Sequence, residues 1–298
     1  MKESIGFVGV GLMGHGMAKN IVENGYDLSV IGHRNRKSID DLVARGAREV
    51  SNLQELGTVS DIVFVCLPGS PQVESVVGGL SAGLSKGGVI VDCSTSDPVS
   101  TLKLAETLAE QGVHLADAPL GGTPVQAEEG TLSAMVGTTA EVFARIEPVI
   151  GTWAGTIVHV GKSGDGHKMK LLNNFLSLGY AALYAEALAL GEKAGISTET
   201  FDSVIRGSRM DCGFYQTFMG YALEGNRDAH KFTLTNALKD LTYLENMANG
   251  VGLANPVGNA AKNSFALAFG AGGRGPTDYV PHLVDFVARQ NGIGSKPS

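Results

Sequence analysis

Lys170 and Asn174 stand four residues apart at the start of a long apolar stretch. This spacing places two side chains on one face of an α-helix, where both can meet the same ligand. A lysine among apolar residues is costly to bury unless it is used, and burial moves the pKa of a lysine toward the range that suits proton transfer. The pattern indicates an acid–base lysine with an asparagine that holds an oxygen or an acid group. A surface lysine with a buried stem fits the residues equally well.

Three glycines, Gly9, Gly11 and Gly14, form G-x-G-x-x-G directly after an apolar run and before a helical one. The first permits a tight turn, the second lets the backbone approach a pyrophosphate, and the third lets helix and strand pack closely. The following helix then offers unpaired N–H groups to the phosphates. The motif predicts a dinucleotide site that also includes Leu12 and Met13. A glycine-rich turn without a ligand is the alternative.

The residues after the second predicted strand favour NADP over NAD. An acid at this place normally bonds the ribose hydroxyls of NAD, but none stands there before Asp40. Arginine suits a 2′-phosphate because its planar set of donors matches the phosphate oxygens. A basic loop exposed to water is the alternative. The predicted 2′-phosphate site consists of His33, Arg34, Asn35 and Arg36.

The composition excludes several classes of protein. The chain has 298 residues, 43% hydrophobic and 18% charged, which argues against disorder. A net charge of −7 without a lysine- or arginine-rich run argues against nucleic-acid and membrane roles. The three cysteines are far apart in the sequence, so we expect no metal site and a reducing, cytoplasmic location. We expect no signal peptide, because the first predicted strand begins almost directly after Met1.

Short apolar runs alternate with helical stretches through the first half of the chain. The runs are too continuous for strands with one face in water, which predicts an α/β fold with a parallel, doubly wound sheet. We expect strands at Ile5–Val10, Leu28–Ile31, Ile62–Leu67, Val89–Asp92 and from His114 to Asp117, and helices at Met13–Asn24, Ile39–Arg45 and Val99–Gln111.

The second half of the chain has a helical pattern. The stretch Lys168–Ala194 is apolar on nearly every face, so we expect a buried helix about 40 Å long. Further helices are expected at Thr235–Asn249, Pro256–Phe269 and Asp278–Arg289. The predicted organisation is a dinucleotide-binding domain over 1–162, a connecting helix over 163–194 and an all-helical domain over 195–298.

The motifs resemble those of the β-hydroxyacid dehydrogenase family, which includes 3-hydroxyisobutyrate dehydrogenase and tartronate semialdehyde reductase. The resemblance covers essentially the whole chain, with five motifs in the family's order. It implies a Rossmann domain, a long connecting helix, an α-helical second domain and assembly as a homodimer or homotetramer. The motifs are Phe7–Asn20, Leu67-Pro68 with Ser94-Thr95, Asp117–Leu132, Gly164-x-Gly166-x-x-x-Lys170-x-x-Asn173-Asn174, and Lys239-Asp240-Leu241.

The resemblance also implies roles for individual residues. Lys170 matches the lysine that gives a proton to the substrate oxygen or takes one from it. Lys239 matches a residue whose charge attracts the cofactor or an acidic substrate. His167 and Lys168 are expected at the rim of the site, without a catalytic role. The residues that match cofactor-lining loops are Leu67, Pro68 and Thr95.

The substrate loop departs from the family pattern. Most relatives have Ser-Gly-Gly after Asp-x-Pro-x, whereas this chain has Gly121, Gly122 and Thr123. The loop is similar to that of a subgroup containing sulfolactaldehyde reductase, but lacks its arginine. Thr123 supplies a hydroxyl only if the loop is displaced, and the glycines expose backbone N–H groups to a carboxylate. The predicted substrate-binding residues are these three and Asn174.

Together the motifs predict an NADP(H)-dependent oxidoreductase that interconverts a small β-hydroxyacid and its semialdehyde by hydride transfer, with Lys170 as proton donor or acceptor. The alternatives are an imine reductase-like enzyme and a non-catalytic NADP-binding module. Relatives of both kinds usually lack the lysine, so Lys170 argues against them.

Overall fold

Six parallel strands form the centre of the sheet in the computed structural model, which describes residues 2–32 and 36–294. They lie in the order β3-β2-β1-β4-β5-β6. Strands buried on both faces need apolar side chains on both, which is why these runs are continuous rather than alternating. The predicted doubly wound, mostly parallel sheet is confirmed. The strands are β1 (Ile5–Val8), β2 (Leu28–Ile31), β3 (Arg48–Val50), β4 (Ile62–Val65), β5 (Val89–Asp92) and β6 (His114–Asp117).

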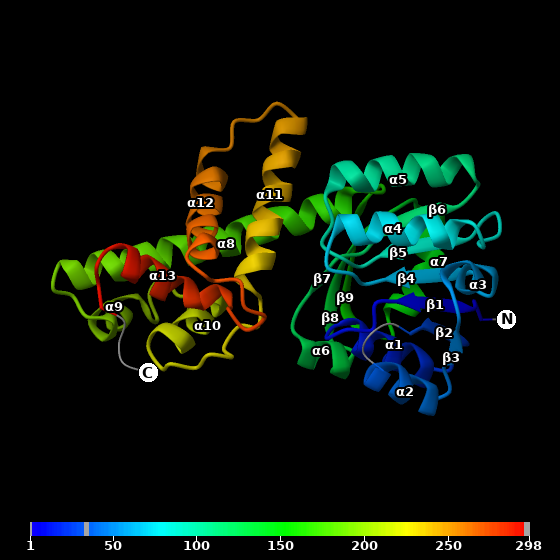
Figure 1. Cartoon of the computed structure of the whole chain (residues 1–298), viewed down its shortest axis with the longest axis horizontal. Coiled ribbons are helices and arrows are strands. Elements are labelled where there is room, and N and C mark those ends of the chain that lie inside the picture. Colours follow the sequence, from blue (N-terminus) through cyan, green and yellow to red (C-terminus); the bar gives the residue numbers. More distant parts are fainter. Residues whose placement is uncertain (1, 33–35, 295–298) are drawn as a thin grey trace. The chain divides into compact units, whose positions relative to one another are not determined.

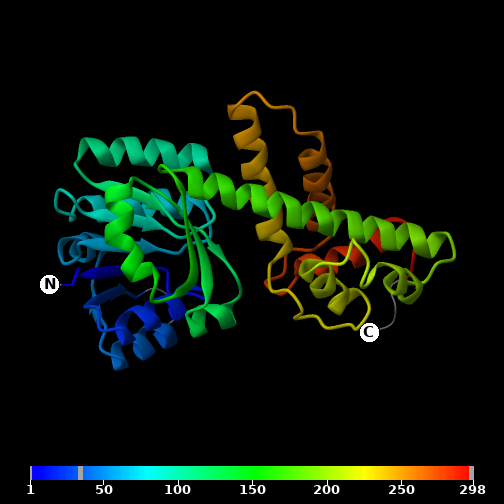
Figure 2. The ribbon, with the colours of Figure 1, turned by 180° about the vertical axis from the view of Figure 1, so that it is seen from behind.

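Helices cover both faces of this sheet. Successive strand residues point to opposite faces, so Ile62 and Phe64 join one core while Val63 and Val65 join the other. Figure 1 shows α4 in front of the strands, and Figure 2, seen from behind, shows α7 in front of them. The first core holds α1 (Gly14–Glu23), α2 (Arg36–Ala44) and α7 (Ala140–Ile150); the second holds α3 (Leu53–Thr58), α4 (Ser70–Ser81) and α5 (Pro98–Glu110).

Beyond β6 the strands of the sheet are no longer all parallel. Strand β8 (Leu132–Gly137) runs antiparallel to β6 and to the short β7 (Leu120–Gly121), and β9 (Ala154–Gly161) runs parallel to β8. Helix α6 (Pro124–Glu129) connects β7 and β8. These elements carry the predicted substrate loop, so that loop is anchored to the sheet at both ends.

The chain divides into two compact units, Met1–Lys170 and Leu171–Ser298, which we describe separately. The second unit is all-helical, and α11 and α12 form an antiparallel pair in it (Figure 1). Among the described residues, no helix is both long and apolar enough to cross a membrane. The helices are α8 (Asp165–Lys193), which begins in the first unit, α9 (Thr198–Ile205), α10 (Gly213–Ala222), α11 (Leu234–Gly250), α12 (Pro256–Gly270) and α13 (Leu283–Gln290), preceded by the 3-10 turn Val280–His282.

Helix α8 is one unbroken helix of 29 residues (Figure 2). Leu178 and Ala185 lie in the core of the second unit, whereas Leu183 and Leu190 are 63% and 71% exposed. The expectation that this helix is buried on every face is therefore wrong for the single chain. The other helices of the unit pack on only part of its circumference.

Candidate active site

The glycine loop has the geometry that a dinucleotide requires. Gly9 has a φ of +95°, and a Cβ there would lie 2.1 Å from the Cys66 carbonyl oxygen. A Cβ at Gly14 would lie 2.1 Å from the Gly9 carbonyl oxygen, so neither position tolerates a side chain. At Gly11 a Cβ would meet no atom of the described residues within 4 Å, and Leu12 is 80% exposed. The closed inner side and open outer side fit a loop whose N–H groups receive a pyrophosphate.

The end of β2 carries an acid that comes from the neighbouring strand. Glu49 on β3 binds Arg36 in a two-pronged ion pair of 2.6 and 3.0 Å, and Asp40 accepts from the same guanidinium at 2.9 Å. Arg36 lowers the pKa of Glu49. A Cβ at Gly32 would lie 2.5 Å from a Glu49 oxygen, so this carboxylate sits at the β2 end. The predicted residues His33, Arg34 and Asn35 lie outside the described part of the chain.

The loops after β4 and β5, which are predicted to line the cofactor, are joined to each other. The Leu67 N–H donates to Ser94 Oγ at 2.9 Å, which links the loop after β4 to the loop after β5. Asp92 at the end of β5 accepts from the Ser94 N–H and the Ser96 hydroxyl, at 2.9 and 2.7 Å. Pro68 is exposed and Thr95 half-buried beside these contacts.

Asp117, at the end of β6, holds the beginning of α8. Its carboxylate oxygens accept from the Gly164 N–H at 2.6 Å and the His167 N–H at 2.7 Å. An acid at a helix N-terminus satisfies unpaired donors and complements the positive end of the helix dipole. Burial raises the pKa of Asp117, and nearby His167 with the two N–H donors opposes that rise. Asp117 thereby fixes the position of the first turn of α8. Lys170 follows in the next turn, so its position depends on the same contacts.

His167 is not a rim residue. Its side chain is completely buried, so that expectation is wrong, whereas Lys168 is half-buried and pairs with Asp165 at 2.8 Å. The His167 ring contacts Thr101 Oγ1 at 2.8 Å and the Ser94 carbonyl oxygen at 3.1 Å. Lys170, one turn later, is half-buried. The first turn of α8 is thus buried in the sheet unit. The spacing between His167 and Lys170 in the sequence did not indicate this burial.

The predicted substrate loop runs from β7 into α6. Thr123 is the N-cap of α6, where its hydroxyl accepts from the Gln126 N–H at 3.4 Å. Gly121 pairs with Ser133 on β8, and a Cβ at Gly121 would lie 2.4 Å from Ser133 Oγ. The half-buried hydroxyl of Ser133 therefore lies beside the position of the missing family serine, and sequence reasoning did not identify it.

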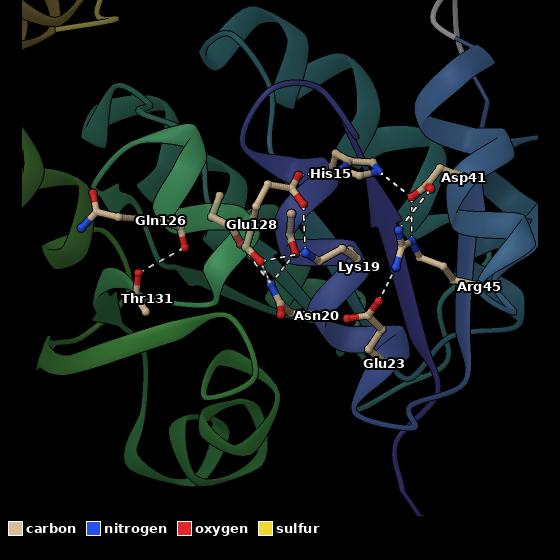
Figure 3. A network of polar contacts seen from close by, with 11 residues as sticks. His15, Lys19, Asn20, Glu23, Asp41, Arg45, Gln126, Glu128 and Thr131 are labelled. Carbon is tan, nitrogen blue, oxygen red and sulfur yellow. Dashed lines mark hydrogen bonds and ion pairs between the residues drawn. The ribbon is translucent and has the colours of Figure 1, made fainter. Parts of the chain in front are cut away.

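A polar network connects α6 to α1, the helix that follows the glycine motif (Figure 3). His15 contacts Glu128 at 2.7 Å through Nδ1 and Asp41 on α2 at 2.9 Å through Nε2. Lys19 pairs with Glu128 at 3.0 Å, and Asn20 donates to the Ala127 carbonyl oxygen at 3.0 Å. The residue after the glycine motif thus connects the substrate loop to the dinucleotide loop.

In the second unit, Asn174 and Lys239 meet at one acid. The Asn174 amide donates to Asp240 Oδ2 at 2.7 Å, and Lys239 Nζ lies 3.1 Å from Asp240 Oδ1. Asp240 is buried, and Lys239 also lies over the Tyr243 ring at 5.3 Å. Because the Asn174 NH2 group donates to Asp240, the amide oxygen is turned away from that acid. The sequence motif alone did not assign this orienting role to Asp240.

Comparison with known families agrees with this arrangement. Residues 4–161 match the model described as the NAD binding domain of 6-phosphogluconate dehydrogenase. Residues 164–281 match the model described as NAD-binding of NADP-dependent 3-hydroxyisobutyrate dehydrogenase. The chain belongs to the β-hydroxyacid dehydrogenase family. The predicted resemblance is confirmed, and the chain is an NAD(P)-dependent enzyme of hydroxyacids and their semialdehydes.

Individual relatives support the same placement. 2-(Hydroxymethyl)glutarate dehydrogenase of Eubacterium barkeri is 40% identical over 204 residues, 67% of each chain. 3-Sulfolactaldehyde reductase of Escherichia coli is 30% identical over 279 residues, 93% of each chain. The solved structure of Mycobacterium tuberculosis 3-hydroxyisobutyrate dehydrogenase with L-serine is 25% identical, with a TM-score of 0.85 over 96% of this chain and 99% of the other.

Proposed function

We propose that this β-hydroxyacid dehydrogenase interconverts a small acidic β-hydroxyacid and its semialdehyde, uses NADP(H) in preference to NAD(H), and transfers the proton through Lys170. The observation that carries the proposal is the anchored start of α8, where Asp117 holds the turn that precedes Lys170. A proton donor needs a fixed position relative to the reacting oxygen, because small misplacements cost much of the rate.

The residues of the chain divide the work. A nicotinamide supplies or accepts the hydride when bound. Lys170 protonates the nascent alkoxide during reduction and removes the hydroxyl proton during oxidation. Asn174, oriented by Asp240, binds the substrate's oxygen or acid group. The backbone N–H groups of Gly121 and Gly122, with Thr123 at the end of the loop, bind the acid group.

Replacing the lysine tests the chemistry directly. We expect Lys170→Ala to lower kcat by about a thousandfold or more while NADPH binding, measured by fluorescence titration, changes little. The matched control is Lys168→Ala, two residues earlier in the same helix and paired with Asp165, which should keep near-native kcat. Both variants are assayed on a panel of semialdehydes and hydroxyacids. Near-native turnover of Lys170→Ala would show that another group moves the proton.

The preference for NADP(H) is supported by Arg36 and the basic residues just before it. Arg36 is held in position by Glu49 and Asp40, and its bidentate donors suit a phosphate. The same ion pair reduces the preference for NADP(H) over NAD(H), because Glu49 competes with a 2′-phosphate for the Arg36 guanidinium. Selectivity is therefore a balance between one arginine at the start of α2 and one glutamate on β3.

This balance predicts opposite effects of two substitutions. The ratio of kcat/KM for NADPH to that for NADH should fall about tenfold or more in Arg36→Ala and rise severalfold in Glu49→Gln. Arg48→Ala is the control, because Arg48 pairs with Glu55 instead. A wild-type preference for NADH would contradict the proposed cofactor. An unchanged ratio in both variants would remove Arg36 and Glu49 from the site.

We also propose that the chain forms a homodimer or homotetramer. The exposed leucines of α8 are the support, since contiguous apolar surface of this kind usually meets another protein surface. Light scattering after size exclusion should give a multiple of the chain mass, and Leu183→Glu should reduce it. A monomeric wild-type chain would contradict this proposal.

A further inference from the structure

His167 is a buried titratable residue that the mechanism above does not use. Its Nε2 faces the Ser94 carbonyl oxygen at 3.1 Å, which can only accept, so Nε2 carries a proton. Its Nδ1 faces the Thr101 hydroxyl at 2.8 Å, and that hydroxyl donates its single proton to the Asp97 carbonyl oxygen at 3.1 Å. With its proton directed to Asp97, Thr101 can only accept from Nδ1, so this orientation of the hydroxyl makes both ring nitrogens donors, as in an imidazolium.

The surroundings carry the charges that balance an imidazolium. Asp92 from β5 lies 3.7 Å from Nε2, and Asp117 from β6 lies 3.8 Å from Nδ1. All three side chains are at least 98% buried. Charges so far from water persist only when opposite charges and hydrogen bonds compensate for lost hydration. The carboxylates of Asp92 and Asp117 are the groups that would balance an imidazolium at His167.

His167 also connects several loops of the first unit that are predicted to form the active site. Through the Ser94 carbonyl oxygen, His167 holds the loop after β5, and the Ser94 hydroxyl holds the Leu67 N–H of the loop after β4. Through Thr101 it holds α5. Its own N–H binds Asp117 at the start of the substrate loop. His167 therefore connects the helix of Lys170, through its ring and its backbone N–H, to the loop after β5, to α5 and to the start of the substrate loop, and through Ser94 to the loop after β4.

We propose that His167 is a positioning residue: its buried ring, which donates from both nitrogens, fixes the helix of Lys170 against the predicted cofactor loops and sets the electrostatic environment of Lys170. The two residues are three apart on α8, so their side chains lie on neighbouring positions of one helix face. A positive charge there disfavours protonated Lys170, and the two carboxylates oppose this effect. The other charged groups in the first turns of α8 are Asp165 and Lys168, which pair with each other, whereas Glu186, Glu192 and Lys193 stand toward its other end.

The protonation state is measurable on the unmodified protein. Nitrogen NMR of histidine-labelled enzyme at pH 8, above the ordinary histidine pKa of about 6.5, should show protons on both ring nitrogens of His167. The signals are assigned by their loss in His167→Gln. A ring with a single proton at this pH would overturn the imidazolium, and this readout does not depend on activity.

The positioning role is tested by kinetics. In folded His167→Gln we expect kcat to fall about tenfold or more, and the alkaline limb of the kcat profile for reduction to move up by about half a pH unit or more. The shift is upward because removal of a positive charge favours protonated Lys170. His159→Gln is the matched control, since His159 also binds a backbone carbonyl oxygen, that of Thr138, at 2.9 Å. The proposal would be overturned if the alkaline limb of the kcat profile stayed at its wild-type pH in His167→Gln, or if it shifted equally in His159→Gln.

A second pair of variants separates charge from position. Asp92→Asn combined with His167→Gln restores the net charge of the cluster, so the limb should return toward its wild-type place while kcat stays low. Thr101→Val should lower kcat without moving the limb, because it removes a contact but no charge. This pH argument rests on Lys170 as the proton donor. If Lys170→Ala keeps its turnover, the proposed function fails, whereas the NMR result and the kcat of Thr101→Val still decide the positioning role.

Discussion

His15 and His167 each stand between two carboxylates from different segments, but water reaches only one of them. The His15 side chain is 21% exposed, and its partners Asp41 and Glu128 are 37% and 41% exposed. His167 and its two acids are nearly or completely buried. The two arrangements share one imidazole between two carboxylates but differ in burial and in distance, because the His15 nitrogens lie 2.7 and 2.9 Å from their carboxylates and the His167 nitrogens 3.7 and 3.8 Å from theirs.

Burial decides what each histidine can do. In water the attraction between charges is screened and the side chains pay rotamer entropy, so exposed pairs hold their partners weakly. In a dry interior, loss of one partner leaves the remaining charges without compensation. We infer that the His167 cluster fixes positions for catalysis, whereas the His15 network attaches the substrate loop adjustably.

The largest expected difference is in stability. His167→Ala should lower the free energy of unfolding by about 3–5 kcal/mol, because two buried carboxylates lose their counter-charge. His15→Ala should cost about 1 kcal/mol or less. Urea unfolding is followed through Trp153, the only tryptophan, which is buried in the core of the first unit. Equal losses in the two variants would show that burial does not separate the networks.

A smaller effect is expected on substrate binding. Glu128→Gln weakens the contacts of α6 with both His15 and Lys19, so the substrate loop becomes less well held. We expect the substrate KM to rise severalfold, with the NADPH dissociation constant almost unchanged. The neighbouring Glu129→Gln, at an exposed position on the same helix, serves as control. A change in NADPH affinity instead of KM would place Glu128 with the cofactor.

The smallest expected effect is a pH dependence of stability. Hydrogen bonds from Arg45 and then His15 outweigh desolvation and lower the pKa of Asp41 to about 2. Because the folded-state pKa lies below the unfolded one, the Asp41 carboxylate stabilises the fold above pH 4 and loses this effect as the pH falls toward 2. Asp41→Asn should flatten the acid limb of unfolding between those values. High salt should shrink the difference, and an unaltered limb would contradict it.

The sequence by itself determined the features that depend on local pattern. Continuous apolar runs between helical stretches require a doubly wound sheet, and Gly9 and Gly14 stand where neighbouring backbone leaves no room for a side chain. The lysine motif and the family also follow from short-range spacing. The motifs are readable because each one spans only a few residues of the chain, even where, as at Gly9, the backbone that excludes a side chain is that of the distant Cys66.

Only the tertiary structure decided which polar residues meet. His167 and Lys168 are adjacent in sequence, but helix geometry turns one into the sheet unit and the other to Asp165. Strand pairing brings Glu49 to Gly32 and Ser133 to Gly121, and helix packing brings Glu128 to His15 across 113 residues. Such contacts depend on register and burial, and a charge acquires its strength from the water that the fold removes around it.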